Sequence, residues 1–267
     1  MSRIEIFYDI DDTLVESEDF FKFLSRAMSY YVLDNYYLNL DEVKNSNDVR
    51  FINQFIDNKY ENSDPELKKL YNTIKDKVNQ NNLGMINYKK NLGLFPYNKK
   101  THFESLIKSS EELNLDIDEN YLDKLAAIPF ESTFLEKDTI KSLEYILNGY
   151  FPRMNVNVFT KGKESIQLKK LDDLGLYSYI DLDNIFVMNE KNTDKLYEVL
   201  STKSYDSSLI IGNSLSDEII PAINCNSDYF WVENEDLFSQ DIKLDKNKIK
   251  KYNLNSFKKY IHSKSRY

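Results

Sequence analysis

The second half of the chain alternates between two hydrophobic patterns. Short apolar runs, typical of buried strands, are separated by segments whose apolar residues recur at helical spacing. The first residues of the chain form another such run. The predicted strands cover residues 3–8, 155–159, 184–188, 207–211 and 228–232. This alternation favours an α/β fold with a doubly wound parallel sheet, right-handed crossovers and the first strand included in the sheet.

Residues 17–128 carry a different pattern, with apolar positions at helical spacing and no convincing strand series. Phe20 and Phe23 belong to an i, i+3, i+4 stripe and are expected to lie in a core. The predicted helices cover residues 19–37, 63–78, 101–113 and 118–128, with an Asn-rich loop at 79–84. We therefore expect a core domain of residues 1–16 and 129–267, with an all-helical domain of residues 17–128 inserted after the first strand.

Composition and charge narrow the partners that this chain can take. The 267 residues include 44 acidic and 35 basic side chains, and the net charge of −9 disfavours general nucleic-acid binding. Cys225 is the single cysteine, which excludes an internal disulfide and fits a reducing compartment. No apolar run approaches the ~20 residues that a membrane helix needs. We expect a soluble, cytoplasmic protein whose partners include neither nucleic acid nor membrane.

Polar side chains follow four of the predicted strands. In an open parallel sheet, ligands bind beyond the carboxyl ends of the strands. The residues at these ends are Asp9, Asp11 and Thr13 for the first strand, Thr160 for the second, Lys191 for the third, and Asn213 and Asp217 for the fourth. We expect them to converge on one edge of the sheet.

This combination of groups suits phosphoryl transfer. One carboxylate can attack phosphorus, and a second carboxylate two residues later can protonate the leaving oxygen and then activate water. The attacking carboxylate and the phosphate are both anionic, so a divalent cation must screen them. Asp9, Asp11 and Asp217 supply the oxygen ligands that Mg²⁺ prefers, and Thr160 and Lys191 can stabilise charge on the transferring oxygens.

These motifs resemble those of the haloacid dehalogenase-like (HAD) superfamily of phosphohydrolases. The four motifs read Asp9-Ile10-Asp11-Asp12-Thr13, Val156-Asn157-Val158-Phe159-Thr160, Lys191 just before a helix, and Gly212-Asn213-Ser214-Leu215-Ser216-Asp217. The resemblance covers the first strand and most of residues 130–232. It implies a Rossmann-like core, and it implies that residues 17–128 form a C1-type helical cap.

The resemblance also implies roles for individual residues. Asp9 is expected to be the nucleophile and a metal ligand, and Asp11 the general acid and base whose backbone carbonyl also binds the metal. Thr160 and Lys191 are expected to hold the phosphoryl group, with Lys195 as an alternative to Lys191. The implied cofactor is Mg²⁺.

The fourth motif departs from the common pattern of the superfamily. Asn213 stands where Asp is commoner, and its amide oxygen can bind or orient water but brings no charge. Whether Asn213 binds the metal directly or through water stays open. Asp217 is therefore the stronger candidate for the remaining metal ligand, and Ser214 is expected to cap the helix that follows.

The expected function is a Mg²⁺-dependent phosphohydrolase that acts on a small phosphate monoester through an aspartyl-phosphate intermediate. The substrate would be a small phosphorylated metabolite such as a nucleotide or a sugar phosphate. The alternatives are a phosphomutase or phosphotransferase that uses the same site, and a non-catalytic binding module built on the same scaffold. Asp11 disfavours a dehalogenase, because by the resemblance dehalogenases lack a carboxylate at that position.

Overall fold

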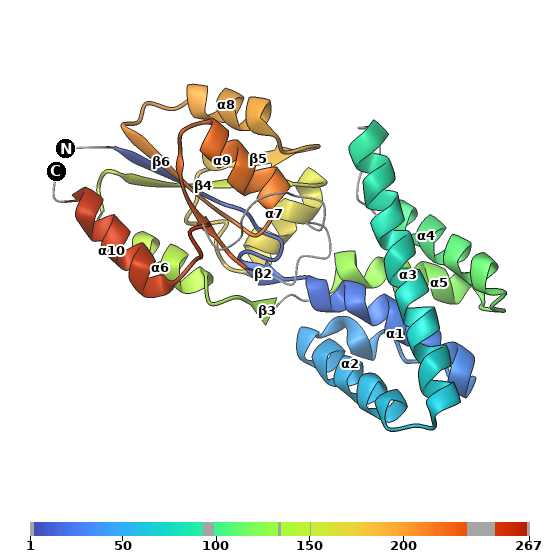
Figure 1. The fold of residues 1–267 in the computed structure, drawn as a ribbon. Coiled ribbons are helices and arrows are strands. Elements are labelled where there is room, and N and C mark those ends of the chain that lie inside the picture. Colours follow the sequence, from blue (N-terminus) through green and yellow to red (C-terminus); the bar gives the residue numbers. More distant parts are fainter. Residues whose placement is uncertain (1–2, 93–98, 133–134, 150, 234–248, 266–267) are drawn as a thin grey trace. The chain divides into compact units, whose positions relative to one another are not determined.

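The computed structural model describes residues 3–92, 99–132, 135–149, 151–233 and 249–265. The chain divides into two compact units, and each is described by itself. The α/β unit comprises Met1–Glu16 and Glu136–Tyr267, and the helical unit comprises Ser17–Leu135 (Figure 1).

The α/β unit is built on a five-stranded parallel sheet with strand order β5-β4-β1-β6-β7. The strands are β1 Ile4–Tyr8, β4 Met154–Lys161, β5 Ile185–Met188, β6 Ser207–Gly212 and β7 Asp228–Trp231. Every residue of the central strand β1 is buried, as a strand covered on both faces requires. The predicted parallel α/β sheet is confirmed, and all five strands lie where the apolar runs place them.

Helices cover both faces of this sheet (Figure 1). They are α6 Ile140–Asn148, α7 Glu164–Asp173, α8 Thr193–Ser201, α9 Ile220–Asn224 and α10 Leu254–Ser265. On one face, Phe7 packs with Leu196 of α8 and Ala222 of α9. On the other face, the Tyr8 hydroxyl is 3.0 Å from Ser142 Oγ of α6. Adjacent β1 residues thus serve opposite cores, which is the period-two alternation of a strand between two helical layers.

Short elements connect the main ones. A 3₁₀ turn lies at η1 Glu42–Lys44 and another at η2 Leu182–Asn184, and a π turn lies at η3 Leu215–Ile219. The strands β2 Val15–Glu16 and β3 Leu135–Glu136 pair with each other as a second, two-stranded sheet.

The helical unit consists of α1 Glu18–Asp34, α2 Ser46–Glu61, α3 Pro65–Leu92, α4 Lys99–Leu113 and α5 Glu119–Glu131. Phe20 and Phe23 of α1 are fully buried in its core, as their helical spacing predicts. The inserted all-helical region of the predicted fold is therefore confirmed. In the ranges that the structure describes, no helix combines the length and the apolarity needed to cross a membrane.

Two local predictions differ from the structure. The predicted loop at 79–84 is wrong, because α3 continues through it to Leu92. A single Gly such as Gly84 costs a helix interior only about 1 kcal/mol, so its presence does not break a long helix. The predicted helix over 118–128 also runs on through Pro129 to Glu131, where the Ser132 N–H donates to the Ile128 carbonyl at 3.1 Å and closes the last turn.

His102 makes the stability of the helical unit depend on pH. Its ring is 4% exposed and stacks on Phe21 with centroids 5.0 Å apart, and burial lowers its pKa from the usual 6.5 to about 4. The unfolded chain binds a proton at His102 below about pH 6.5 while the folded chain does not, so stability falls as the pH drops towards 4. Between pH 7.5 and pH 5.0 this linkage removes roughly 2 kcal/mol from the free energy of unfolding.

The measurement is urea unfolding of the wild type and of His102→Leu at both pH values. The wild type is expected to lose about 2 kcal/mol more than the variant between pH 7.5 and pH 5.0. An equal loss in both proteins would contradict the assignment, whatever the absolute stability of His102→Leu.

Candidate active site

The site is organised around Asp9, which directly follows β1. Its backbone N–H donates to the Ile211 carbonyl at 3.0 Å, which continues the β1–β6 pairing by one residue and anchors the side chain at the carboxyl edge of the sheet. The Asp9 side chain is 7% exposed, and its Oδ1 lies 2.7 Å from the Lys191 ammonium, whose side chain is 3% exposed. Burial raises the pKa of Asp9, and the lysine opposes that shift.

Lys191 connects three elements of the α/β unit. Besides Asp9, its ammonium forms an ion pair with Glu218 on the η3 turn and lies 3.4 Å from the Phe159 carbonyl of β4. Burial disfavours the charge, but the carboxylates of Asp9 and Glu218 outweigh it and hold the pKa of Lys191 above its usual value. Lys191 is therefore a fixed buried cation. Lys195, the alternative lysine, pairs instead with Glu198 one helical turn away on α8.

Glu218 is a site residue that the sequence reasoning missed. Its Oε2 accepts from the Ser214 N–H at 2.7 Å, and its side chain is 2% exposed. Burial raises its pKa to about 8. A Cβ on Gly212 would lie 2.4 Å from Glu218 Cγ, so the glycine makes room for this carboxylate beside β6. The sequence places Glu218 directly after Asp217, which was a signal for a second carboxyl group at the site. Which of the two contacts Lys191 depends on the path of the backbone turn, which the sequence does not show.

Asp11 lies on the loop that leaves β1, where Ile10 is fully buried and accepts the Leu14 N–H at 2.8 Å. The Asp11 carboxylate contacts α7 on both of its oxygens. Lys170 Nζ lies 2.5 Å from Oδ1, and Gln167 Nε2 donates to Oδ2 at 2.9 Å. Neither α7 residue was predicted to belong to the site.

Thr160 is the second-last residue of β4, so it lies within the strand and not beyond its end. Its side chain is fully buried, and its Oγ1 hydrogen-bonds to no group within the described ranges. A buried hydroxyl without a partner costs free energy, so this group is available to a ligand that reaches it. That ligand would receive a hydrogen bond from the threonine.

Asn213 and Asp217 do not contact Asp9 directly. Asn213 Oδ1 accepts from Thr13 Oγ1 at 3.3 Å, while Asp217 pairs with Lys161 at 2.5 Å. Burial raises the pKa of Asp217, but the ammonium groups of Lys161 and Lys191 lower it further, so the net shift is downward. Ser214 caps the turn, since its Oγ accepts the Asp217 N–H at 3.2 Å.

Lys161 is a second cation at this edge, and the sequence analysis did not include it among the site residues. It is the last residue of β4 and its side chain is 29% exposed. The signal was present, because Lys161 directly follows Thr160 at the same sheet edge. A lysine next to a loop is nevertheless solvated in most proteins, and only the fold brings Asp217 within its reach.

The donor chemistry of this edge fits a magnesium ion. Four carboxyl groups, those of Asp9, Asp11, Asp217 and Glu218, lie at this edge and are paired with the three ammonium groups of Lys161, Lys170 and Lys191. Mg²⁺ takes oxygen ligands, commonly one or two carboxylates with several waters. No three His, Cys, Asp or Glu side chains among the described residues form a ready metal centre, so carbonyl, amide and water oxygens would have to complete the shell.

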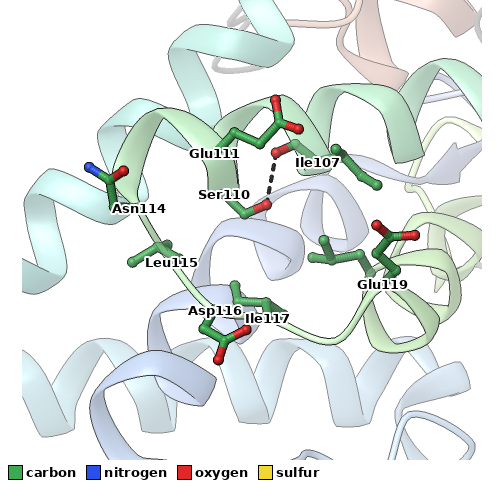
Figure 2. Close-up of a pocket in the computed structure, with 9 residues that line it drawn as sticks. Ile107, Ser110, Glu111, Asn114, Leu115, Asp116, Ile117 and Glu119 are labelled. Carbon is green, nitrogen blue, oxygen red and sulfur yellow. Dashed lines mark hydrogen bonds between the residues drawn. The ribbon is translucent and has the colours of Figure 1, made fainter.

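A separate cavity of about 380 Å³ lies within the helical unit, between α4 and α5 (Figure 2). Its wall contains the carboxylates of Glu111, Asp116 and Glu119, and Ser110 Oγ donates to the Ile107 carbonyl at 2.8 Å. None of the residues from the strand ends lines it. The cavity therefore contributes nothing to the chemistry assigned to the sheet edge.

Several solved structures share this fold. A haloacid dehalogenase-like family hydrolase from Xanthomonas campestris is 16% identical over 99% of both chains, with a TM-score of 0.61. A HAD-hydrolase from Bacillus subtilis bound to magnesium is 16% identical over 98% of this chain and 99% of its own, with a TM-score of 0.56. A protein described as a β-phosphoglucomutase from Thermotoga maritima is 12% identical over 97% and 98%, with a TM-score of 0.54.

The chain has the fold of the haloacid dehalogenase-like hydrolases, which confirms the fold that its motifs predict. No family model and no curated protein sequence matches it. The matched structures also include a 2-haloacid dehalogenase, so hydrolases, a mutase and a dehalogenase share this architecture. A fold that carries several chemistries cannot select one of them, and the reaction must be argued from the side chains.

Proposed function

We propose that the protein is a Mg²⁺-dependent phosphohydrolase that cleaves a small phosphate monoester by way of an aspartyl-phosphate on Asp9. The observation that carries the proposal is the buried pair of Asp9 and Lys191 at the end of β1. This pair supports the proposal because a carboxylate can attack phosphorus, and a fixed cation beside it can stabilise negative charge on a phosphoryl group. Thr160 supports the same proposal, because its hydroxyl has a hydrogen bond to give.

In the first half of the reaction, an Asp9 oxygen attacks phosphorus and the bond from phosphorus to the leaving oxygen breaks. Asp11 donates its proton to that oxygen, so the alcohol leaves neutral. In the second half, Asp11 removes a proton from water, the water oxygen attacks phosphorus, and the acyl-phosphate bond breaks. Inorganic phosphate leaves and Asp9 is regenerated as a carboxylate.

A bound Mg²⁺ would screen the repulsion between the anionic nucleophile and the anionic ester. The residues that would hold it are Asp9, the backbone carbonyl of Asp11 and Asn213, together with Asp217 or Glu218. The oxygen donors gathered at this edge support the assignment, because Mg²⁺ takes oxygen ligands. Asn213 would add an oxygen without charge, so Asp217 or Glu218 would supply the second carboxyl ligand.

The first test measures release of p-nitrophenol from p-nitrophenyl phosphate with Mg²⁺ and with EDTA. We expect turnover with Mg²⁺, loss to the background rate in EDTA, and recovery when excess Mg²⁺ is added back. One free phosphate is expected for each p-nitrophenol released. A phosphomutase or phosphotransferase would instead pass the phosphoryl group to another hydroxyl and release less free phosphate. A 2-haloacid serves as the matched control substrate.

Two results would overturn the proposal. Halide release from the 2-haloacid would assign a dehalogenase instead. Absence of both turnover and phosphate labelling of Asp9, with acetyl phosphate as a reactive donor, would leave a binding module on this scaffold.

A further inference from the structure

Helix α7 presents two buried polar side chains to one carboxylate. Gln167 and Lys170 are 3% and 6% exposed, and they lie three residues apart, so they share one face of the helix. Both reach Asp11, one on each carboxylate oxygen, at 2.9 Å and 2.5 Å.

The orientation of the Gln167 amide follows from its surroundings. Its Nε2 donates to Asp11 Oδ2 and also to the Lys161 carbonyl at 3.0 Å. A flipped amide would place its oxygen against both of these acceptors, so the two contacts together require the nitrogen at this position.

The backbone between β4 and α7 is shaped for this contact. Gly162 has a φ of +145°, and a Cβ at that position would lie 2.8 Å from Gln167 Nε2. A side chain there would be strained and would push the amide away from Asp11. The glycine therefore permits the approach of Gln167 to the carboxylate.

Ordering a buried lysine and a buried glutamine costs side-chain entropy and desolvation, so these contacts need a compensating gain. Asp11 is on the loop after β1, and its side chain is 33% exposed, so it is only partly enclosed by its surroundings. Two donors on its two oxygens restrict both χ angles. Proton transfer to a leaving oxygen is sensitive to such placement, since misplacing a catalytic group by about 1 Å can cost about 100-fold in rate.

We infer that Lys170 and Gln167 are positioning residues that hold the Asp11 carboxylate in the orientation from which it exchanges its proton with the substrate oxygen and with water. This inference rests on the proposed function, since it assumes that Asp11 is the acid and base. It adds two residues of α7 that act through Asp11 and do not touch the phosphoryl group.

The test is a double-mutant cycle between Lys170→Met and Asp11→Asn, with p-nitrophenyl phosphate as substrate. Lys170→Met is expected to lower kcat by about 10- to 100-fold while KM changes less than about 3-fold. In the Asp11→Asn background the same substitution is expected to change kcat by less than about 2-fold, because the group it orients is gone. Lys170→Arg, which keeps a donor, is expected to recover most of the lost rate.

Lys169→Met is the matched control. Lys169 neighbours Lys170 on α7, but its side chain is 68% exposed and pairs with Asp173. This control is expected to keep the wild-type kcat. If Lys170→Met does not fold, as judged by circular dichroism, Gln167→Leu replaces it in the same cycle.

The outcomes separate the inference from the proposed function. Equal losses from Lys170→Met with and without the Asp11 carboxylate would overturn the positioning role, since the lysine would then act on something else. An unchanged kcat in Lys170→Met would overturn it as well. A wild type that neither releases phosphate with Mg²⁺ nor is labelled on Asp9 by acetyl phosphate would overturn the proposed function before the cycle is reached.

Discussion

Replacing Asp9 by Asn is expected to reduce kcat for p-nitrophenyl phosphate by roughly 10³- to 10⁶-fold, the range seen when an enzyme nucleophile is removed. Asn has nearly the shape of Asp, and the backbone bond from residue 9 to the Ile211 carbonyl remains. The amide cannot form an acyl-phosphate, so both half-reactions are lost. Steady-state kinetics, together with acetyl phosphate labelling of residue 9 detected by mass spectrometry, measures both consequences.

The control for Asp9→Asn is the same change at the neighbouring carboxylate Asp12. Asp12 has a φ of +56°, a conformation that Asn adopts as readily as Asp, so Asp12→Asn should fold and keep kcat within about 3-fold of the wild type. Lys191 keeps its ion pair with Glu218 in Asp9→Asn, so that variant should also fold. Turnover by Asp9→Asn near the wild-type rate would show that Asp9 is not the nucleophile. Deamidation of the new Asn would regenerate Asp9, so Asp9→Ala, which cannot revert in this way, is measured beside it.

Replacing Asp11 by Asn is expected to separate substrates by the quality of their leaving groups. A poor leaving group such as an alkoxide needs a proton in the transition state, so formation of the phosphoenzyme from an alkyl phosphate should slow by roughly 10²- to 10⁴-fold. A good leaving group such as p-nitrophenolate needs little protonation, and its first turnover should slow far less. Rapid-quench measurement of the first turnover isolates this step from hydrolysis of the phosphoenzyme.

The second half-reaction adds a separate signature for Asp11→Asn. Water then lacks its base, so the aspartyl-phosphate should accumulate and p-nitrophenol should appear as a burst followed by a slow phase. The wild type measured with both esters is the internal reference. Equal slowing of the first turnover for the two leaving groups would contradict an acid role for Asp11.

Local signals explain why the sheet was predictable from the sequence. The strands are short apolar runs, and an all-buried strand such as β1 has to be apolar at nearly every position. The helices between them begin and end at recognisable residues. Gly175, for example, follows the end of α7 and has a φ of +67°. The predicted loop at 79–84 failed because Asn and Gly weaken a helix by small increments, and the backbone hydrogen bonds of α3 outweigh them.

The candidate site was predictable only in part. Asp9, Thr160 and Lys191 could be found because parallel strands bring their carboxyl ends to one edge, whatever the side chains do there. Their partners could not be found in this way. Asp11 and Lys170 are separated by 159 positions in the chain, and nothing in the sequence marks Lys170 as different from the exposed Lys169 beside it.

The turn after β6 shows the same limit. The sequence offers two adjacent carboxylates, Asp217 and Glu218, and the motif resemblance favours the first. The η3 turn directs Asp217 to Lys161 and Glu218 to Lys191, so it is the second carboxyl group that shares a lysine with the predicted nucleophile. A one-residue choice of this kind depends on how the backbone winds, which is a property of packing and not of residue type.

The sequence by itself determined the α/β fold with its helical insertion and the order of polar residues along the sheet edge. These follow from periodicity and from the geometry of parallel strands, which act over a few residues at a time. Only the tertiary structure decided which lysine meets which carboxylate. Pairs such as Asp11 with Lys170, or Asp217 with Lys161, form because the fold brings the two members within reach of each other. A charge held away from water, such as that of the 7% exposed Lys170, needs an opposite charge beside it.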